Sequence, residues 1–243
     1  MASQSNKLNL ADLDVVYPVK PTRDGNSELR YSLRSLRNLP HRNVHIFSDY
    51  ILWLDEHKVK RHPSSDRPDK QRFANVNQTL LRACDDPNIS DPFIFMNDDF
   101  FVMKPVKEIP YYVNGTLQQH YDYLHRTYQG SKYMRDLLET QSELKRLGLG
   151  TLDFEVHAPI IFYKDELRRI LKAYPNAACR RTLYANSMKV KWKQAIDFKI
   201  YGFGDNFDHN RPFVSTADAN FRRQSGVRSM IRSEFTTPSP YEK

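Results

Sequence analysis

The hydrophobic and polar positions of the N-terminal part predict a strand, a helix and a second strand in that order. Residues 13–17 form a short apolar run that ends at Pro18, which is typical of a buried parallel strand. Residues 28–39 carry leucines at helical spacing, and Asn26 or Ser27 is placed to begin this helix. Residues 43–48 read as the next strand. The order predicts a parallel strand pair joined by a right-handed crossover.

The rest of the chain continues to alternate between the two kinds of element. A charged stretch with two prolines, residues 58–72, predicts a long loop. The clearest strand is the apolar run 92–96, and residues 154–163 are expected to be partly extended. Helices are expected over residues 73–84, over 117–147 as two helices broken near Gln129 and Gly130, and over 165–173.

This alternation predicts an α/β fold of Rossmann type, with a mostly parallel central sheet flanked by helices. The 243 residues suffice for a single domain with a well-buried core. In such sheets ligands bind at the carboxyl ends of the strands. The residues that follow positions 17, 47 and 96 are therefore the first candidates for a functional site.

An acidic pair follows the clearest strand. Asn97, Asp98 and Asp99 lie between two apolar runs, unlike the acids of a solvated loop. Neighbouring carboxylates repel one another, and a divalent cation relieves that repulsion. Oxygen ligands of this kind suit Mg²⁺ or Mn²⁺. The alternative is that both acids cap a turn.

A second group of candidates alternates along one segment. Asp153, Glu155 and His157 share one face if their segment is extended, and an imidazole beside carboxylates can act as a general base. The alternative is an exposed edge strand. Lys70 stands at the start of an expected helix, where a phosphate could bind. Asp197 and Lys199 read either as an ion pair or as substrate contacts.

Composition adds a charge argument. The formal net charge is +8 and the pI is near 9.4, which favours polyanionic partners. Four arginines of the C-terminal segment could contribute to such a surface: Arg222, Arg223, Arg228 and Arg232. No run is long and apolar enough to span a membrane, no signal peptide is recognised, and the two cysteines form no metal or redox motif. We therefore expect a cytoplasmic protein, in the host cytoplasm if a phage encodes it.

Several of these stretches together resemble a known family. Asp14–Tyr17, Asn26–Leu36 with its ELRYSLRS motif, Phe93–Phe101 with its NDDFF motif, and Phe154–Pro159 with its His-x-Pro segment are similar to the Stealth proteins. Those are sugar-phosphate transferases of capsule synthesis. The chain also resembles small GT-A-type glycosyltransferases of phages and bacteria. It departs from the Stealth pattern after the first strand, where Pro18 begins a different sequence.

The resemblance implies roles for individual residues. Asp98 and Asp99 would hold Mn²⁺ or Mg²⁺ and the donor diphosphate, together with Asn97. Tyr17, Pro18 and Lys20 would lie near the nucleotide. Arg30 would contact phosphate or hold the site together, and His157 would take part in catalysis. Residues 1–102 would form the nucleotide-sugar half of the domain, and 103–243 the acceptor half with the Arg-rich segment.

The leading hypothesis is a metal-dependent glycosyltransferase that moves a hexose from a UDP-sugar to a hydroxyl. His157, Glu155 or Asp153 would orient or deprotonate the acceptor, which we expect to be DNA carrying hydroxymethylated pyrimidines. Two alternatives stay open: a Stealth-type sugar-1-phosphate transferase that acts on a glycan, and a non-catalytic nucleic-acid-binding domain. The sequence leaves the sugar, the stereochemistry and the oligomeric state open.

Overall fold

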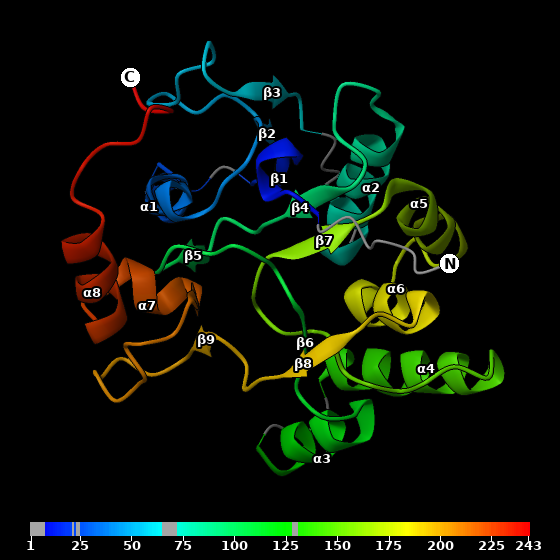
Figure 1. Cartoon of the computed structure of the whole chain (residues 1–243). Coiled ribbons are helices and arrows are strands. Elements are labelled where there is room, and N and C mark those ends of the chain that lie inside the picture. Colours follow the sequence, from blue (N-terminus) through cyan, green and yellow to red (C-terminus); the bar gives the residue numbers. More distant parts are fainter. Residues whose placement is uncertain (1–7, 21, 23–24, 65–71, 128–130) are drawn as a thin grey trace, which may run out of the picture.

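A computed structural model describes residues 8–20, 22, 25–64, 72–127 and 131–243. Its central sheet has five strands in the order β3-β2-β1-β4-β7 (Figure 1). Their bounds are β1 Val15–Pro18, β2 Val44–Phe47, β3 Lys60–His62, β4 Phe93–Phe95 and β7 Ile160–Phe162. Strands β3, β2, β1 and β4 run parallel to one another, and β7 pairs antiparallel with β4. The predicted α/β class with a mostly parallel central sheet is therefore confirmed.

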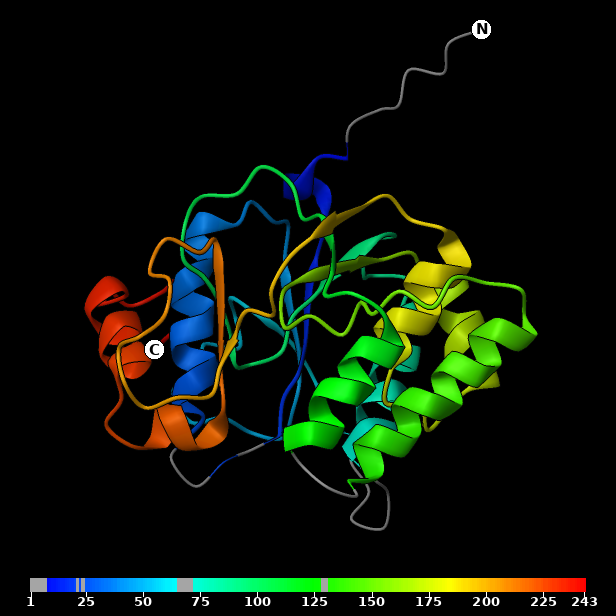
Figure 2. The ribbon, with the colours of Figure 1, turned by 90° about the horizontal axis from the view of Figure 1, so that it is seen from below.

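Helices cover both faces of this sheet (Figure 2). Helix α1, Ser27–Ser35, packs its leucines on one face against Val15 and Tyr17. The other face is covered by α2 Arg72–Asp85, α5 Lys164–Ala173 and α6 Arg180–Met188. Alternate residues of β1 point to opposite faces, so Val16 joins the second cluster. A strand buried on both faces must be apolar throughout, which explains the continuous run in the sequence.

Two smaller sheets extend the domain. Strand β5 Phe100–Val102 pairs antiparallel with β10 Phe213–Thr216, and β10 pairs parallel with β9 Lys199–Ile200. Strand β6 Tyr111–Val113 pairs with β8 Trp192–Gln194. The remaining elements are α3 Leu117–Thr127, α4 Lys132–Arg146, α7 Asp218–Arg222, α8 Gly226–Glu234 and two 3₁₀ turns, Leu10–Asp12 and Leu36–Asn38. Strand β5 follows β4 after four residues, so the acidic pair lies where the chain passes from the central sheet to a second sheet.

Most predicted elements are present, but the structure also contains elements that the sequence did not predict, among them strand β3 and helix α6. The expected loop 58–72 contains the edge strand β3, whose charged side chains are largely exposed and hide the strand from a hydrophobic pattern. Helix α6 was not expected, because nearly all of its residues are buried and it shows no polar face. No helix in the described ranges is long and apolar enough to cross a membrane.

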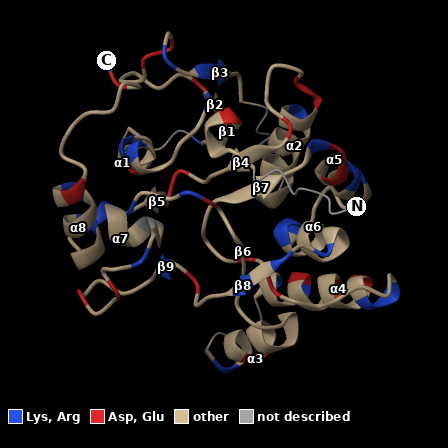
Figure 3. Cartoon of the chain, in the orientation of Figure 1, with Lys and Arg blue, Asp and Glu red and all other residues tan. Residues whose placement is uncertain are grey.

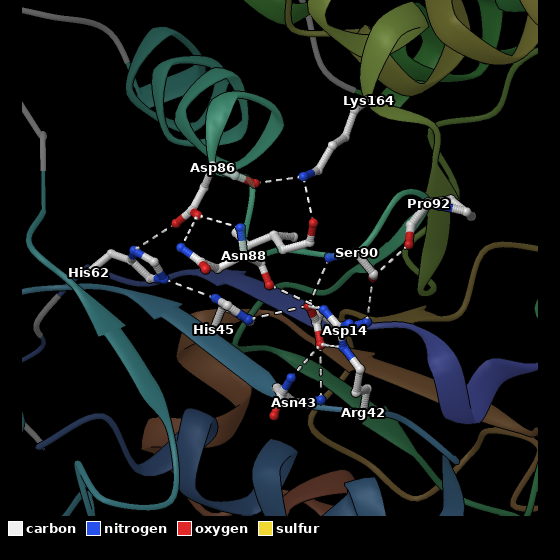
Figure 4. A network of polar contacts seen from close by, with 11 residues as sticks. Asp14, Arg42, Asn43, His45, His62, Asp86, Asn88, Ser90, Pro92 and Lys164 are labelled. Atoms are coloured by element: carbon white, nitrogen blue, oxygen red, sulfur yellow. Dashed lines mark hydrogen bonds and ion pairs between the residues drawn. The ribbon is translucent and has the colours of Figure 1, made fainter.

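A buried polar network fixes the amino-terminal edge of the sheet (Figure 4). The fully buried carboxylate of Asp14 accepts hydrogen bonds from the Arg42 guanidinium at 2.9 and 2.6 Å and from the Ser90 amide at 2.8 Å. Burial alone would raise the pKa of Asp14, but these donors, with Asn43 and His45, hold it well below its ordinary value. Asp14 therefore ties the start of β1 to the segments that precede β2 and β4.

Two histidines extend this network to the edge strand. His45 Nδ1 lies 2.9 Å from His62 Nε2, and the outer ring nitrogens face Asp14 at 3.4 Å and Asp86 at 3.7 Å. Only one proton can lie between the two inner nitrogens, so one ring donates in this contact and the other accepts. Burial and the neighbouring His45 lower the pKa of His62, although Asp86 acts in the opposite direction. The folded protein thus favours an uncharged His62.

This lowered pKa predicts a loss of stability in mild acid. Below about pH 6.5 the unfolded chain takes up a proton at position 62 more readily than the folded protein does. The free energy of unfolding should therefore fall between pH 7.5 and 5.5, and it should fall less steeply in His62→Gln. Urea denaturation at several pH values measures the difference, with His57→Gln in an exposed loop as the control. Equal slopes for the wild type and His62→Gln would contradict the prediction.

Candidate active site

The acidic pair lies at the carboxyl end of β4, as predicted. The turn that contains it is closed by a hydrogen bond from the Phe100 amide to the Asn97 carbonyl at 3.2 Å. Asn97 and Asp98 are half-buried, whereas Asp99 is buried. The two neighbouring acids thus have different surroundings.

Asp99 has its partners inside the protein. Its Oδ2 accepts hydrogen bonds from Lys199 Nζ and from the Ser215 hydroxyl, both at 3.0 Å. Its carbonyl accepts the Thr216 amide at 3.2 Å. These contacts attach the turn to β9 and β10. The carboxylate of Asp99 is therefore neutralised by a lysine in this structure.

His157 is held by a carboxylate that lies 40 positions further along the chain. The His157 amide donates to Asp197 Oδ1 at 2.8 Å, and His157 Nδ1 lies 2.8 Å from Asp197 Oδ2. Burial alone would raise the pKa of Asp197, but the hydrogen bonds from His157 lower it, so Asp197 is ionised. Because a carboxylate only accepts, Nδ1 carries a proton, and in the neutral ring Nε2 therefore holds the lone pair. The imidazole is about one-third exposed, so this is the geometry of an oriented base.

The segment from Asp153 to His157 does not form a strand. Asp153 is buried, and its carboxylate lies 2.8 Å from His120 Nδ1. Burial alone would lower the pKa of His120, but Asp153 raises it above its ordinary value. Burial raises the pKa of Glu155, although Arg180 and Arg181 favour its ionised form. Each of the three side chains thus has a partner of its own within the protein.

Arg181 fixes the backbone on both sides of His157. Its Nη1 donates to the carbonyl groups of Val156 and Ala158, both at 2.7 Å. The guanidinium lies over the rings of Phe95 and Phe100, 5.3 and 5.2 Å from their centroids. Burial lowers the pKa of Arg181 to about 10, so it stays charged at neutral pH. Its Nη2 has no hydrogen-bond partner among the described residues.

The residues predicted to lie near the nucleotide have different environments. Tyr17 is completely buried, and its hydroxyl lies 3.0 Å from that of Ser32, so it has no surface to offer a ligand. Burial raises the pKa of Tyr17 far above its ordinary value. Pro18 is half-buried, and Lys20 is exposed at the same edge of the sheet. Lys70 lies outside the described residues.

Arg30, which was expected to contact phosphate or to hold the site together, has partners within the protein. Its guanidinium lies over the Trp53 ring at 4.6 Å and pairs with Glu242 at 3.3 Å. Arg34 binds the same carboxylate through two hydrogen bonds of 2.7 and 2.8 Å. Nearby, the Tyr241 hydroxyl lies 2.6 Å from His41 Nε2. The C-terminal segment is thus fastened along α1.

The protein ligands present suit a divalent cation only if the substrate supplies the others. Among the residues that the structure describes, no three His, Cys, Asp or Glu side chains gather as ligands for a metal ion. Mg²⁺ commonly uses one or two carboxylates together with substrate phosphates and water. Asp98, with Asn97 beside it, matches that pattern at the carboxyl edge. Asp99 already binds Lys199 and Ser215 through its Oδ2.

The sequence did not predict the partners of several side chains that come from later segments. Asp197 and Lys199 were expected either to pair with one another or to contact substrate, but Asp197 binds His157 and Lys199 binds Asp99. The sequence gave no secure role to Arg181. Phe100 connects the parts, because it directly follows Asp99 and its ring lies 6.3 Å from that of His157. The structure therefore brings the acidic turn and the histidine to one place.

Comparisons with known proteins give structural neighbours only. No family model matches the chain, and no curated protein matches it in sequence. The glycosyltransferase GlyE of Streptococcus pneumoniae TIGR4 shares 10% identity at a TM-score of 0.39, over 76% of this chain and 45% of its own. The apo structure of the bifunctional glycosyltransferase WbbM shares 10% sequence identity at a TM-score of 0.43, and the match covers 93% of this chain and 45% of WbbM. Mouse xyloside xylosyltransferase 1 shares 9% sequence identity at a TM-score of 0.40, and the match covers 92% of this chain and 94% of the mouse protein.

The chain thus spans less than half of the first two structures. At these identities and TM-scores, the likeness carries no argument about the activity of this chain.

Proposed function

We propose that this chain is a glycosyltransferase that moves a hexose from a UDP-sugar to an acceptor hydroxyl with the help of Mn²⁺ or Mg²⁺. One observation carries the proposal: His157, held by Asp197, lies against the ring of Phe100, two residues after the half-buried Asp98 at the carboxyl end of β4. Ligands of α/β sheets bind at this edge. A base for a hydroxyl and a carboxylate for a metal diphosphate are the two parts that sugar transfer needs.

The residues divide the reaction between them. His157 Nε2 takes the proton of the acceptor hydroxyl, whose oxygen bonds to the anomeric carbon of the sugar. The bond from that carbon to the diphosphate oxygen breaks, and UDP leaves with the electron pair. Asp98 would hold the cation, which neutralises the developing charge of the diphosphate. Asp197 keeps the imidazole in the reactive tautomer and stabilises its charged form.

The experiment that tests the proposal measures turnover of nucleotide sugars. The protein is incubated with a panel of UDP- and GDP-sugars, with and without Mn²⁺, and the released nucleotide is identified by mass spectrometry. Mn²⁺-stimulated release of UDP supports glycosyl transfer. Release of UMP would point to sugar-1-phosphate transfer, and no release with any donor would favour a binding domain.

The expected acceptor, DNA with hydroxymethylated pyrimidines, needs its own test. Lys and Arg are spread over several elements (Figure 3), and Arg34 of α1 and Arg37 of the 3₁₀ turn that follows it pair with Glu242 and Glu234. Support for a DNA acceptor is thus the net charge of +8 rather than one basic face. Binding to DNA that weakens steeply with salt would support this acceptor, and binding unaffected by salt would remove it.

Asp98→Asn should lower turnover on the order of 100-fold and leave the unfolding temperature near that of the wild type. The reason is that an amide loses the charge that attracts the cation, and removal of one electrostatic contact to a transition state has an effect of this size. Initial rates over a range of Mn²⁺ concentrations measure the change. Asp122→Asn on the exposed surface of α3 is the control. A rate within threefold of the wild type would exclude Asp98 from the site.

A further inference from the structure

A second histidine–aspartate pair lies near the one that holds His157. Nδ1 of His120, on α3, lies 2.8 Å from Oδ2 of Asp153, in the same way as His157 Nδ1 lies on Asp197. We propose that His120 binds the acceptor, and that its Nε2 forms a hydrogen bond to a hydroxyl oxygen that neighbours the reacting hydroxyl, as in a sugar. This inference rests on the proposed function and names the class of acceptor.

The fold builds the two pairs on neighbouring segments. Strands β6 and β8 are parallel and end together, since the Ala195 amide donates to the Val113 carbonyl at 2.9 Å. The chain continues from β6 into α3, which carries His120, and from β8 to Asp197, which holds His157 (Figure 1). Both pairs therefore depend on segments that leave the same end of this small sheet.

The segment from Asp153 to His157 joins the two pairs. The Asp153 amide donates to the Gly115 carbonyl at 3.0 Å, and the Asp153 carbonyl accepts the Asn114 amide at 3.1 Å, so this residue is attached to the chain just before α3. At the other end of the segment, Arg181 binds the carbonyl groups on both sides of His157. The spacing between the two imidazoles is thus set by a short segment that is fixed at both ends.

Electrostatic interactions also connect the two pairs. Burial alone would lower the pKa of His120, but Asp153 raises it above its ordinary value, with further contributions from Glu155 and Asp197. Asp197 is the carboxylate that binds His157. Because such effects weaken with distance, the action of Asp197 on His120 supports one common site for both rings.

The outer nitrogen of the His120 ring is available to a ligand. Asp153 occupies Nδ1, and no residue that the structure describes hydrogen-bonds to Nε2. The imidazole is 21% exposed and its Asp153 anchor only 2%, so the ring reaches the surface while the carboxylate stays inside. The Tyr133 ring packs edge-on against it at 5.8 Å. A ring held in this way can bind a substrate oxygen with little loss of conformational freedom.

The charges around His120 favour a neutral partner. The charged groups with the largest effect on its pKa are the carboxyl groups of Asp153, Glu155 and Asp197. They would repel a phosphate of a nucleic-acid acceptor, whereas a hydroxyl oxygen carries no charge. We therefore expect the oxygen at His120 to belong to a sugar.

Monodeoxy acceptors test this contact. The wild type and His120→Ala are assayed with the nucleotide sugar that the wild type uses and with a panel of methyl glycosides, each also without one of its hydroxyl groups. For the wild type, loss of one particular hydroxyl should lower kcat/KM about 10- to 100-fold, as expected when a hydrogen bond to a charged group is lost. His120→Ala should use the parent glycoside about 10- to 100-fold less well, chiefly through KM, and should be nearly indifferent to that hydroxyl. His125→Gln, on the exposed surface of α3, is the control.

A second variant separates binding from folding. His120→Ala leaves the buried Asp153 carboxylate without its partner, and we expect Tm to fall. The His120→Ala/Asp153→Asn variant removes both charges and should recover most of that loss. It should still be indifferent to the missing hydroxyl, because Nε2 is absent. A purely structural role of His120 predicts instead that discrimination returns together with stability.

Each contrary outcome has a distinct meaning. Full discrimination between parent and monodeoxy glycosides by His120→Ala would overturn the inference. Transfer by the wild type to an oligonucleotide with hydroxymethylated cytosine, and to none of the glycosides, would contradict a sugar acceptor while the proposed function stands. No release of UDP by the wild type with any donor would contradict the proposed function, and the inference with it.

Discussion

Replacement of His157 by alanine is expected to lower turnover on the order of 10³- to 10⁴-fold while donor binding changes little. In the proposed reaction the imidazole is the general base, and a positioned general base commonly contributes a factor of this size. Because Nε2 acts on the acceptor, the effect should appear in kcat and leave the Mn²⁺-dependent affinity for UDP intact. Steady-state kinetics with a reactive donor, together with a UDP-binding measurement, checks both parts.

Asp197→Asn tests the carboxylate that binds His157. The amide keeps the size of the side chain but removes the charge that stabilises a protonated imidazole, so turnover should fall at least 100-fold. His57→Ala, in an exposed loop, is the control. Turnover of His157→Ala within threefold of the wild type would remove this residue from the chemistry, whatever the result for Asp197.

Arg181→Met is expected to produce the largest loss of stability, about 3–5 kcal/mol in the free energy of unfolding. Methionine fills similar space, but Glu155 and Asp197 lose the buried cation that balances their charge. The carbonyl groups of Val156 and Ala158 also lose their donor. Turnover should fall as well, because these carbonyls flank His157. Urea denaturation and initial rates at a temperature where the variant is folded measure the two effects.

Arg181→Lys separates charge from geometry. A lysine restores the positive charge but lacks the planar fork that reaches two carbonyl groups, so stability should recover more than turnover does. Arg169→Met on the exposed side of α5 is the control, since its guanidinium is 58% exposed and pairs with a surface glutamate. A wild-type unfolding free energy for Arg181→Met would show that the buried carboxylates do not depend on this arginine.

The sequence predicted the central sheet well because its strands are buried on both faces. Continuous apolar runs at 13–17 and 92–96 leave few alternatives to a parallel strand. It also placed Asp98 at the ligand-binding edge, since strand order and polarity follow from the alternation with helices. The hydrophobic pattern missed the edge strand β3 because its side chains are largely exposed. It missed helix α6 because nearly all residues of that helix are buried.

The internal partners of the site could not be read from local patterns. His157 meets Asp197 across 40 positions and Asp99 meets Lys199 across 100, and both contacts depend on where β9 packs. Arg30 resembled a phosphate ligand but pairs with Glu242 at the far end of the chain. The sequence shows which charge a motif residue carries, whereas tertiary packing determines which residue that charge pairs with.

The fastening of α1 by the C-terminal segment has a consequence for how the chain is synthesised. Arg34 and Glu242 are separated by 208 positions, so the ionic surroundings of an early helix are completed only after residue 242 has left the ribosome. Contacts of such long range slow folding. A nascent chain that already holds its first strands would therefore leave Arg34 without its carboxylate partner until translation has nearly ended.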